Sequence, residues 1–382
     1  MKQNILILTN RPLHNGPRII REIEALKTDF EITVIGRTPP VDKDVKFIFQ
    51  ADFIPSLPER AIHKFYRVLN GGKYISWPFP TLLKLVRKYI KKACPNIIIA
   101  HDPEFLPYLK ILKQTYDFKI VYNAHEYHPL QFDSDVKWLK TIGYFYDKIY
   151  RNYLCYVDLM INVCNGIKDK CLQEYGKDSI VIPNACTYYP NIQPIFNKEL
   201  PIKVIHHGGA IKQRRIEIMI DTIEQLNGKF TLDLILLKTD PIYYSFLEKK
   251  IANCKYVKTI EPVAFNQIVP LLNKYDIGLF NLPPDTFNYK YALPNKLFEF
   301  IQARLCIVIS NSIEMKKIVK ENDLGWVSEG FGIQELTNIL NQIDLDTINS
   351  FKKSAAGSAE KLSAEHYYNI YLNSIDCLVA SK

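Results

Sequence analysis

The sequence predicts an α/β protein made of two Rossmann-like domains in tandem, and three observations support this fold class. The chain has 382 residues, a length more typical of two domains than of one. Short, nearly all-apolar runs alternate with longer helical patterns, as in parallel sheets covered by helices on both faces. This alternation stops once, at residues 183–201, which contain four prolines and no clear periodicity.

The first alternation fills the N-terminal half of the chain. Its expected strands are residues 4–8, 31–35, 96–100, 118–122, 159–163 and 179–182. Its main expected helices are residues 18–27, 80–93 and 136–154. Because β-branched, apolar strands of this kind are usually buried on both faces, we expect residues 1–183 to form one domain.

The second alternation follows a linker at residues 184–201. Its expected strands are residues 203–206, 232–237, 277–280 and 306–309. Its expected helices are residues 216–226, 265–274 and 295–303. We therefore expect residues 202–365 to form a second Rossmann-like domain. Ligands of such sheets bind beyond the carboxyl ends of the strands, and two domains that face each other enclose a cleft there.

Composition excludes several classes of protein. Hydrophobic residues make up 47% and charged residues 23% of the chain, which is typical of a globular protein and not of a disordered or fibrous one. No apolar run approaches the ~18–20 residues of a membrane-spanning helix. The apolar run near the N-terminus is too short for a signal peptide. Eight scattered cysteines, none in a CxxC pair, indicate reduced thiols of a cytosolic protein.

Motifs for metal binding and serine hydrolysis are weak or missing. The string at residues 125–128, HEYH, is one residue short of HExxH, so its histidines do not share a helix face. Three Asp-x-Asp strings, at residues 42–44, 133–135 and 344–346, do not directly follow strong strands. The sequence has no GxSxG elbow. We therefore expect no metal requirement and no cofactor.

Positive charge gathers in the N-terminal half. Residues 1–184 carry 27 Lys+Arg against 19 Asp+Glu, whereas the rest of the chain carries 22 against 21. Residues 60–101 contain no acidic residue and several aromatic ones, which suits an anionic surface. Nucleic acid is not expected as a partner, because no helix-turn-helix, zinc-finger or ribonucleoprotein motif accompanies this charge.

One predicted helix in this basic stretch is a candidate for docking on an anionic membrane. Its basic residues are Lys84, Arg87, Lys88, Lys91 and Lys92. Two interpretations remain open: the helix docks on the inner leaflet, or its apolar residues face the domain core and its lysines are simply solvated.

A glycine pair and a basic cluster follow the first strand of the second domain. Gly208 and Gly209 precede Lys212, Arg214 and Arg215. Glycines let the backbone approach a ligand closely, and basic side chains beside a helix N-terminus suit a diphosphate. The pattern matches neither GxGxxG nor the P-loop. A solvated basic turn is the alternative.

A second motif, NYKYALPNKLFEF, occupies residues 288–300. Pro294 suits the first turn of a helix, where free backbone N–H groups and Lys296 would hold a phosphate. Glu299 lies four residues after Asn295, on the same helix face, and its carboxylate would accept both hydroxyls of a ribose. The alternative is a charge placed only to suit the helix dipole.

Together these motifs resemble the C-terminal domain of glycosyltransferase family 4, whose members are retaining, metal-independent enzymes of the GT-B fold. The likeness extends to residues 14–22 (HNGPRIIRE), 100–102 (AHD), 122–126 (YNAHE) and 182–184 (IPN), and so covers nearly the whole chain. It implies two Rossmann-like domains facing across a cleft, with the acceptor on the first and the nucleotide sugar on the second. It also implies that residues 366–382 return to the first domain.

The resemblance implies roles for single residues. Arg214 falls where the family has a Lys or Arg on the donor diphosphate, although the adjacent Arg215 could take that role. Glu299 matches the second glutamate of the family's E-x7-E motif, which holds the ribose. Tyr291 stands where the first glutamate is expected, a departure that concerns the donor sugar. Related sequences of this subtype use Asn288 and Tyr291 instead.

His125 matches a histidine that lies near the sugar and acceptor in the family, where it orients the sugar or steadies charge at the anomeric carbon through its backbone carbonyl. The alternative is a histidine bonded within the sheet edge. The expected catalytic residues are His125, Arg214 and Glu299. The expected donor-binding residues are Gly16, Gly208, Gly209, Lys212, Arg214, Arg215, Asn288, Tyr291, Leu293, Pro294, Asn295, Lys296 and Glu299. The residues expected at the acceptor or membrane are His101, Asp102, Glu126, Lys84, Arg87, Lys88, Lys91 and Lys92.

The resemblance therefore implies transfer of a sugar from a UDP- or GDP-linked donor to a glycan, one carried on a lipid diphosphate, in bacterial surface-polysaccharide synthesis. The protein would work in the cytoplasm, at the inner face of the membrane. Two alternatives remain open from the sequence. One is a nucleotide-sugar 2-epimerase of the same fold, and the other is a non-catalytic module that binds nucleotide or glycan.

Overall fold

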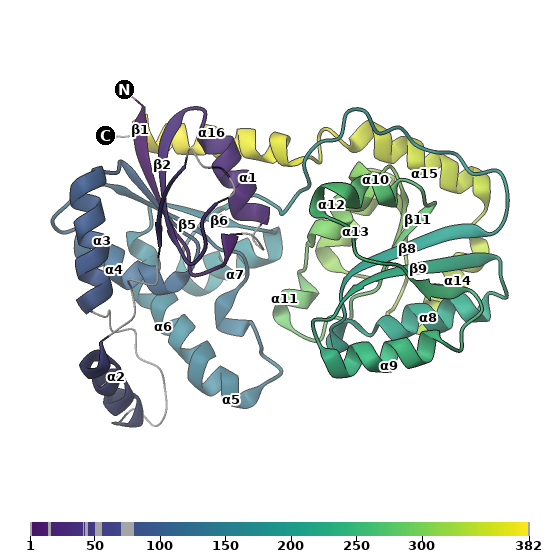
Figure 1. The fold of residues 1–382 in the computed structure, drawn as a ribbon, viewed down its shortest axis with the longest axis horizontal. Coiled ribbons are helices and arrows are strands. Elements are labelled where there is room, and N and C mark those ends of the chain that lie inside the picture. Colours follow the sequence, from purple (N-terminus) through teal and green to yellow (C-terminus); the bar gives the residue numbers. More distant parts are fainter. Residues whose placement is uncertain are drawn as a thin grey trace. The chain divides into compact units, whose positions relative to one another are not determined.

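A computed structural model describes residues 2–13, 17–40, 42, 45–49, 56–69 and 80–380. The chain forms two compact units (Figure 1), each described separately below. The N-unit comprises Met1–Pro183, Thr286–Asn288 and Tyr368–Lys382, and the C-unit comprises Asn184–Asp285 and Tyr289–Tyr367. The C-unit includes residues 184–201, which the sequence analysis takes as a linker, and residues 286–288 belong to the N-unit.

The N-unit is built on a seven-stranded parallel sheet with the order β3-β2-β1-β4-β5-β6-β7. Its strands are β1 (Gln3–Leu8), β2 (Phe30–Gly36), β3 (Lys46–Phe49), β4 (Ile97–Ala100), β5 (Lys119–Asn123), β6 (Leu159–Asn162) and β7 (Ile180–Val181). The order reverses between β1 and β4, which pair directly. In an open α/β sheet this switch point is where ligands bind, so the loops after these two strands are of first interest.

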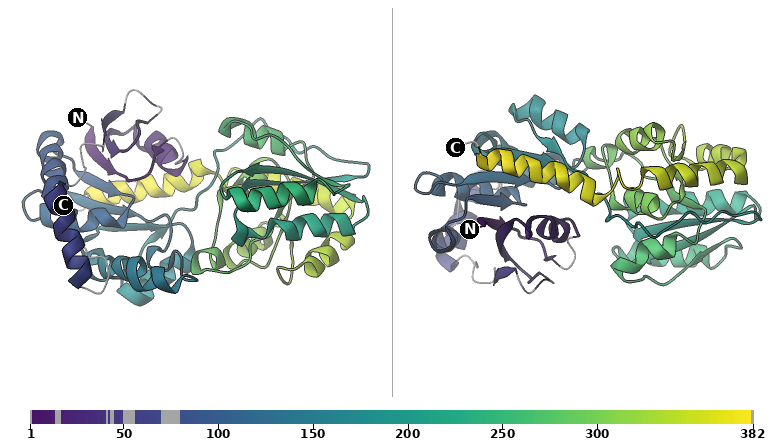
Figure 2. Two further views of the ribbon diagram at one scale, coloured as in Figure 1. Left: turned by 60° about the horizontal axis from the view of Figure 1, so that its bottom comes forward. Right: turned by 90° about the horizontal axis from the view of Figure 1, so that it is seen from above.

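Helices cover both faces of the N-unit sheet (Figure 2). They are α1 (Pro17–Leu26), α2 (Leu57–Leu69), α3 (Pro80–Ala93), α4 (Leu106–Leu112), α5 (Val136–Trp138), α6 (Tyr144–Tyr153), α7 (Asn165–Tyr175) and α16 (Ala364–Ala380). The predicted helix at residues 136–154 is interrupted, because the π-turn Leu139–Gly143 separates α5 from α6. The tyrosine hydroxyl of Tyr368 in α16 donates to the Arg18 carbonyl at 3.0 Å, which ties the end of the chain to this unit.

The C-unit repeats the same strand order, β10-β9-β8-β11-β12-β13, with its switch point between β8 and β11. Its strands are β8 (Ile202–Gly209), β9 (Phe230–Leu237), β10 (Val257–Thr259), β11 (Ile277–Phe280), β12 (Cys306–Ile309) and β13 (Gly325–Val327). Strand β8 is longer than predicted and pairs with β9 through Gly209, so the glycine pair lies at the end of a strand and not in a loop.

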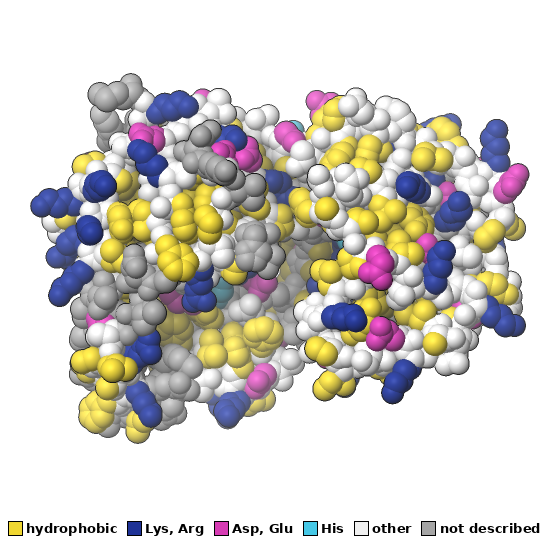
Figure 3. Space-filling model, viewed as in Figure 1, with side chains coloured by type: hydrophobic (Ala, Val, Ile, Leu, Met, Phe, Trp, Pro, Cys, Tyr) yellow, Lys and Arg dark blue, Asp and Glu magenta, His cyan; other side chains and the backbone are white. Residues whose placement is uncertain are grey.

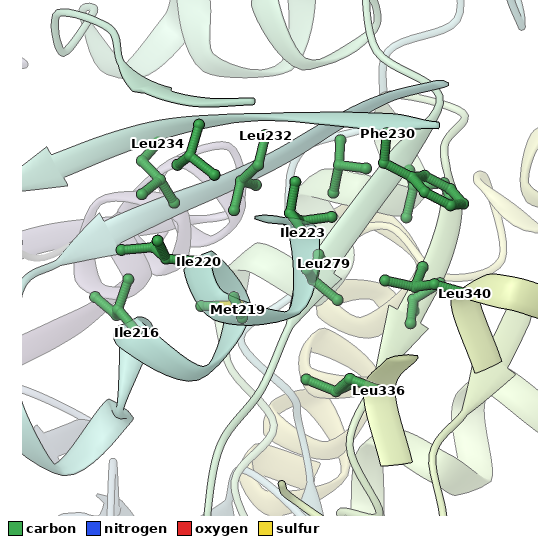
Figure 4. Close-up of a cluster of buried hydrophobic side chains, with 14 of the residues drawn as sticks. Ile216, Met219, Ile220, Ile223, Phe230, Leu232, Leu234, Leu279, Leu336 and Leu340 are labelled. Carbon is green, nitrogen blue, oxygen red and sulfur yellow. The ribbon is translucent and has the colours of Figure 1, made fainter. Parts of the chain in front are cut away.

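The C-unit helices pack on this sheet. They are α8 (Ile216–Gln225), α9 (Pro241–Ile251), α10 (Ile268–Leu272), α12 (Asn295–Gln302), α13 (Ile313–Glu321), α14 (Ile333–Gln342) and α15 (Leu345–Ser358). The short helix α11 (Phe287–Lys290) is divided between the units, because Phe287 and Asn288 belong to the N-unit. Figure 4 shows the core that α8 and α14 make with the strands, in which Met219 and Leu340 are fully buried beside Leu279. Gly278 lets β11 lie close to α12, because a Cβ there would come within 2.4 Å of the Phe300 ring.

One buried ion pair anchors α15 and the linker to the C-unit sheet. The Lys352 ammonium, on a side chain only 1% exposed, lies 2.8 Å from an Asp276 carboxylate oxygen and donates to the Ile195 carbonyl at 2.6 Å. The other Asp276 oxygen accepts from the Asn197 amide and the Lys203 backbone. Every charge in this group is therefore satisfied, as a buried pair requires.

The structure also tests the predictions on the cysteines and on membrane-spanning helices. All eight cysteines are unpaired thiols, as predicted. Within the part of the chain that the structure describes, no helix has the length and apolar character needed to cross a membrane.

Candidate functional site

The carboxyl end of β8 in the C-unit forms a small space lined by two cations. Gly208 adopts a φ of +133°, which favours glycine, and it carries no side chain. A Cβ at this position would lie 3.0 Å from the Lys296 ammonium and 3.2 Å from the Arg214 guanidinium. The missing side chain therefore leaves room where two positive groups converge.

Arg214 and Arg215 have different surroundings, which separates two residues that the sequence left equivalent. The Arg214 guanidinium donates to the Gly209 carbonyl at 3.1 Å, and burial lowers the pKa of this side chain. Arg215, with a positive φ of 47°, instead forms a two-oxygen pair with Asp285 at 2.9 and 3.0 Å. Only Arg214 flanks Gly208, while Lys212 is exposed to solvent.

Lys296 is a buried cation whose charge is opposed by Arg214 and only partly offset by Glu299. Its side chain lies in the first turn of α12, is 6% exposed, and has no hydrogen-bond partner among the described residues. Its ammonium lies 4.1 Å from the centre of the Phe280 ring. Burial, together with the Arg214 charge, lowers the pKa of Lys296 well below its ordinary value. A group of this kind favours an anionic ligand, which would restore the charged form.

Glu299 lies one turn further along α12, in contact with His207. The nearest oxygen of Glu299 and Nε2 of His207 are 3.2 Å apart, and both side chains are buried. Burial, with smaller contributions from Lys296 and Arg214, lowers the pKa of His207 to about 3. A neutral His207 that places its Nε2 proton toward Glu299 orients this carboxylate beside the two cations.

The remaining residues predicted to bind the nucleotide-sugar donor lie at separate positions in the structure. The helix α12 begins at Asn295, as predicted, but Pro294 precedes it as its N-cap and does not lie in its first turn. Leu293 is buried, and Tyr291 lies under the Lys290 ammonium at 5.4 Å. The Asn288 amide oxygen accepts from the Tyr127 backbone at 2.9 Å within the N-unit. Gly16 lies outside the described residues.

In the N-unit, the predicted residues at the ends of β4 and β5 form one buried network. Nδ1 of His101 lies 2.9 Å from Nε2 of His125. Nε2 of His101 lies 2.7 Å from Glu22, and neither side chain is exposed. The other Glu22 oxygen accepts from the Asn123 amide at 2.7 Å. His125 is therefore fixed by a chain of contacts that begins on α1.

Asp102 follows the same strand but holds the first loop of the unit together. Its carboxylate accepts from the Asn10 backbone at 2.6 Å and from the Thr9 hydroxyl at 3.5 Å, and it lies 3.6 Å from the Arg11 guanidinium. This places Asp102 at the switch point between β1 and β4, in contact with the loop after β1.

The pKa values of two neighbouring carboxyls are raised. Burial raises the pKa of Glu126. Burial and the charge of Asp102 raise the pKa of Glu104, whose carboxylate also accepts from the Tyr146 hydroxyl at 2.8 Å. Carboxyl oxygens accept hydrogen bonds from hydroxyl groups, which suits a polyhydroxylated ligand.

Sequence reasoning assigned no role to Glu22 or His207, and it considered Glu104 only as an acid/base candidate for the epimerase alternative. Glu22 is part of the HNGPRIIRE segment, and its position on the buried face of α1 is the signal that was available. His207 directly precedes the glycine pair, at the end of an apolar strand. Across the described ranges, the structure brings no three His, Cys, Asp or Glu side chains into a group that could hold a metal ion.

Comparisons with known proteins agree with these observations. The family model of Glycosyltransferase Family 4 matches residues 19–186, which confirms the resemblance for that part of the chain. A sequence search of curated proteins finds no match.

Several solved structures share the architecture of the whole chain. Sucrose-phosphate synthase from Thermosynechococcus elongatus is 13% identical, with a TM-score of 0.75 over 100% of both chains. HepE from Anabaena, in complex with UDP and glucose, is 14% identical, with a TM-score of 0.70 over 98% of this chain and 100% of that one. The lipopolysaccharide outer core galactosyltransferase WaaB is 15% identical, with a TM-score of 0.67 over 98% of this chain and 99% of that one. The predicted α/β fold with two Rossmann-like domains, the GT-B type, is confirmed.

Proposed function

On the premise that residues 19–186 carry the Glycosyltransferase Family 4 signature and that the whole chain has the GT-B fold, we propose that the protein is a retaining, metal-independent hexosyltransferase. It moves a sugar from a nucleotide-diphosphate donor to a glycan acceptor. The observation that carries this proposal is the space at Gly208, where the Arg214 guanidinium meets the buried Lys296, which has no hydrogen-bond partner among the described residues. A diphosphate supplies the negative charge that this space lacks.

The residues of the C-unit perform the chemistry in the following way. When the bond between the anomeric carbon and the diphosphate oxygen breaks, negative charge develops on the diphosphate. Lys296, Arg214 and the N–H groups at the start of α12 stabilise this charge in a site that excludes water, so that no metal ion is needed. The acceptor oxygen bonds to the same face of the sugar, and its proton passes to the departing diphosphate.

Glu299 positions the nucleoside part of the donor. Its carboxylate, oriented by His207 at 3.2 Å, accepts hydrogen bonds from the two ribose hydroxyls. This contact sets the distance between the ribose and the diphosphate space, since Glu299 and Lys296 project from neighbouring turns of α12. The complex of HepE with UDP and glucose supports UDP as one nucleotide to test first.

The N-unit supplies the acceptor site. Glu126 and the neighbouring Glu104 lie at the carboxyl end of its sheet, where their carboxyl groups offer hydrogen bonds to sugar hydroxyls. His101, also predicted at the acceptor, is fully buried with both ring nitrogens in contact with other side chains, so it does not itself face the acceptor. A lipid-diphosphate-linked glycan of a bacterial surface polysaccharide is the acceptor we propose. The likeness to WaaB, a lipopolysaccharide galactosyltransferase, supports this choice of acceptor class.

Two helices of the N-unit support docking at an anionic membrane surface. On α3 the side chains of Lys84, Arg87, Lys88, Lys91 and Lys92 are all exposed, while Val86 and Ile90 face the core. On α2 four apolar side chains are exposed by about half or more: Leu57 (79%), Ile62 (49%), Phe65 (61%) and Val68 (69%). Figure 3 shows the basic side chains over α3 and apolar side chains over α2. Arg60 and Lys64 lie on the polar side of α2, which makes this helix basic and amphipathic.

Flotation with vesicles tests this docking. We expect binding to anionic vesicles that falls with salt and is weakened when Lys84, Lys88, Lys91 and Lys92 are changed to Gln, since each lysine contributes about 1 kcal/mol near such a surface. Changing Leu57, Phe65 and Val68 to Ser should also release the protein. Ile242→Ser with Phe246→Ser, on exposed apolar residues of α9, is the matched control. Binding that is absent, or unchanged in the α2 and α3 variants, refutes docking.

Product analysis tests the function itself. The protein is incubated with a panel of UDP- and GDP-sugars and glycan acceptors, and products are followed by mass and anomeric configuration, with and without EDTA. We expect a retained glycosidic product that survives EDTA and is lost in Arg214→Ala and Glu299→Ala, but not in Lys249→Ala on the exposed surface of α9. A free epimer of the donor would indicate an epimerase, and nucleotide binding without any product would indicate a binding module.

A further inference from the structure

Three side chains from separate elements of the N-unit form a linear relay that ends at His125. Glu22 comes from α1, His101 follows β4, and His125 follows β5. The Glu22–His101 contact is 2.7 Å and the His101–His125 contact is 2.9 Å. Glu22 and His101 are fully buried, so water does not reach the first contact.

Simple hydrogen-bond logic places the protons along this relay. A carboxylate oxygen and a bare imidazole nitrogen repel each other at 2.7 Å, so Nε2 of His101 must carry a proton. In a neutral His101, Nδ1 is then an acceptor. The proton between the two rings must therefore sit on Nε2 of His125, which leaves Nδ1 of His125 with a bare lone pair.

The Glu22 carboxylate also has a cationic neighbour beside the relay. Burial would raise the pKa of Glu22, but the neighbouring His101 and several hydrogen bonds outweigh this effect, so the pKa of Glu22 is lowered. Arg18, which is 3% exposed and donates to the Asn123 amide oxygen at 2.5 Å, offsets the Glu22 charge.

Arg18 also fixes which Glu22 oxygen faces which partner. Because Arg18 occupies the Asn123 oxygen, the Asn123 NH₂ must point at Glu22, where it donates to one carboxylate oxygen at 2.7 Å. Only the other oxygen remains for His101. Tyr371 of α16 also faces Glu22, but a hydroxyl that can donate or accept does not decide this orientation.

We propose that Glu22 is a positioning residue that acts through a neutral His101, protonated on Nε2, to hold His125 in the Nε2–H tautomer. In this tautomer Nδ1 of His125 accepts a hydrogen bond from a sugar hydroxyl. The role of this atom in transfer rests on the proposed function, whereas the tautomer itself does not.

An isosteric substitution provides a sharp test. In Glu22→Gln the Asn123 NH₂ still needs a hydrogen-bond acceptor. The glutamine oxygen therefore turns toward Asn123, and the glutamine NH₂ turns toward His101. Nε2 of His101 must then accept, Nδ1 must donate, and His125 is driven to the Nδ1–H tautomer. In Glu22→Gln with Asn123→Asp, the new carboxylate accepts from both Arg18 and the glutamine NH₂. The glutamine oxygen faces His101 again, and the original tautomer returns.

Two-bond ¹H–¹⁵N correlation spectra of the imidazole rings read the tautomer of His125 directly, with His125→Asn identifying its signals. We expect Nε2–H in the wild type, Nδ1–H in Glu22→Gln and Nε2–H again in the double variant. Glu24→Gln, an exposed position on the same helix, is the control that should change nothing. Circular dichroism and thermal melting establish that each variant is folded.

Any of three results overturns the relay: Nδ1–H or a doubly protonated His125 in the wild type, no change of the His125 tautomer in Glu22→Gln, or no return of the original tautomer in the double variant.

Transfer assays add a second readout. We expect Glu22→Gln to lower kcat by about 100-fold with little change in donor KM, since misplacing one group at a reacting centre has an effect of this size. Activity should recover in the double variant. Tautomers that switch as expected in a protein without transferase activity would refute the proposed function and leave the relay intact.

Discussion

The two units share a strand order but treat buried charge at the carboxyl ends of their sheets in opposite ways. In the N-unit, Glu22 lies among Arg18, His101 and Asn123, which offset its buried charge, and one of its oxygens accepts from the Asn123 amide. In the C-unit, Lys296 is buried beside Arg214 with its ammonium unpartnered.

This difference separates two kinds of functional surroundings. A network of close polar contacts holds a side chain in one orientation before any ligand arrives. A buried charge without a hydrogen-bond partner is unfavourable until an oppositely charged ligand pairs with it. In our proposal the N-unit network therefore positions His125, and the C-unit cluster binds the diphosphate.

The largest effect is expected from a comparison of two buried lysines of the C-unit, Lys352 and Lys296. Lys352 is paired with Asp276, so Lys352→Met leaves a buried carboxylate without its partner and should lower the free energy of unfolding by about 3–5 kcal/mol. Denaturant unfolding measures this change. A loss under about 1 kcal/mol would show that the Asp276 group is not satisfied in the way described.

Removing the Arg214 guanidinium should affect transfer almost as strongly, but not folding. Arg214→Ala takes away one of the two cations that face the diphosphate, and we expect kcat to fall on the order of 10²–10³-fold. Arg215→Ala is the informative comparison, because its guanidinium pairs with Asp285 and does not flank Gly208. Equal losses in the two variants would refute the distinction between these arginines.

In the ligand-free protein, Lys296→Met should change the free energy of unfolding in the opposite direction to Lys352→Met. The substitution removes a buried cation that has no hydrogen-bond partner, so we expect the free energy of unfolding to rise by about 1–3 kcal/mol while donor binding is lost. Thermal melting with and without UDP or GDP measures both effects. If Lys296→Met instead destabilises the free protein, the Lys296 ammonium has a partner that stabilises the fold.

The pH dependence of stability offers a smaller, independent test. Because burial lowers the pKa of Lys296 in the folded protein, the unfolded chain binds more protons between that lowered pKa and the ordinary value of 10.5. Stability should therefore rise with pH through this window, and Lys296→Met should flatten that rise. Parallel curves for the two proteins would show that the pKa of Lys296 is not lowered.

The sequence predicted most of the fold because apolar runs and helical periodicity are local signals. It missed β3, β10 and β13, which have three or four residues and lie at or near sheet edges, where few apolar residues mark a strand. It also treated residues 136–154 as one helix, since a π-turn leaves the composition unchanged.

The candidate site was predictable only in part. Gly208, Arg214, Lys296 and Glu299 were found because glycine and basic residues at strand and helix ends have a direct chemical meaning. The contact between Glu22 and His101 joins residues that are far apart in the sequence, and no periodicity reveals it. Likewise, the different partners of Arg214 and Arg215 depend on the turn that places them on opposite sides of the chain.

Calorimetric titration of Gly208→Ala with UDP and GDP tests the central claim most directly. The added methyl occupies the space between Lys296 and Arg214, so we expect the nucleotide affinity of the wild type to be lost in this variant. Gly176→Ala is the control for backbone strain, because Gly176 also has a positive φ of 63° but has nothing near its Cβ position. Retained affinity in Gly208→Ala, or equal loss in both variants, would contradict a diphosphate site at Gly208.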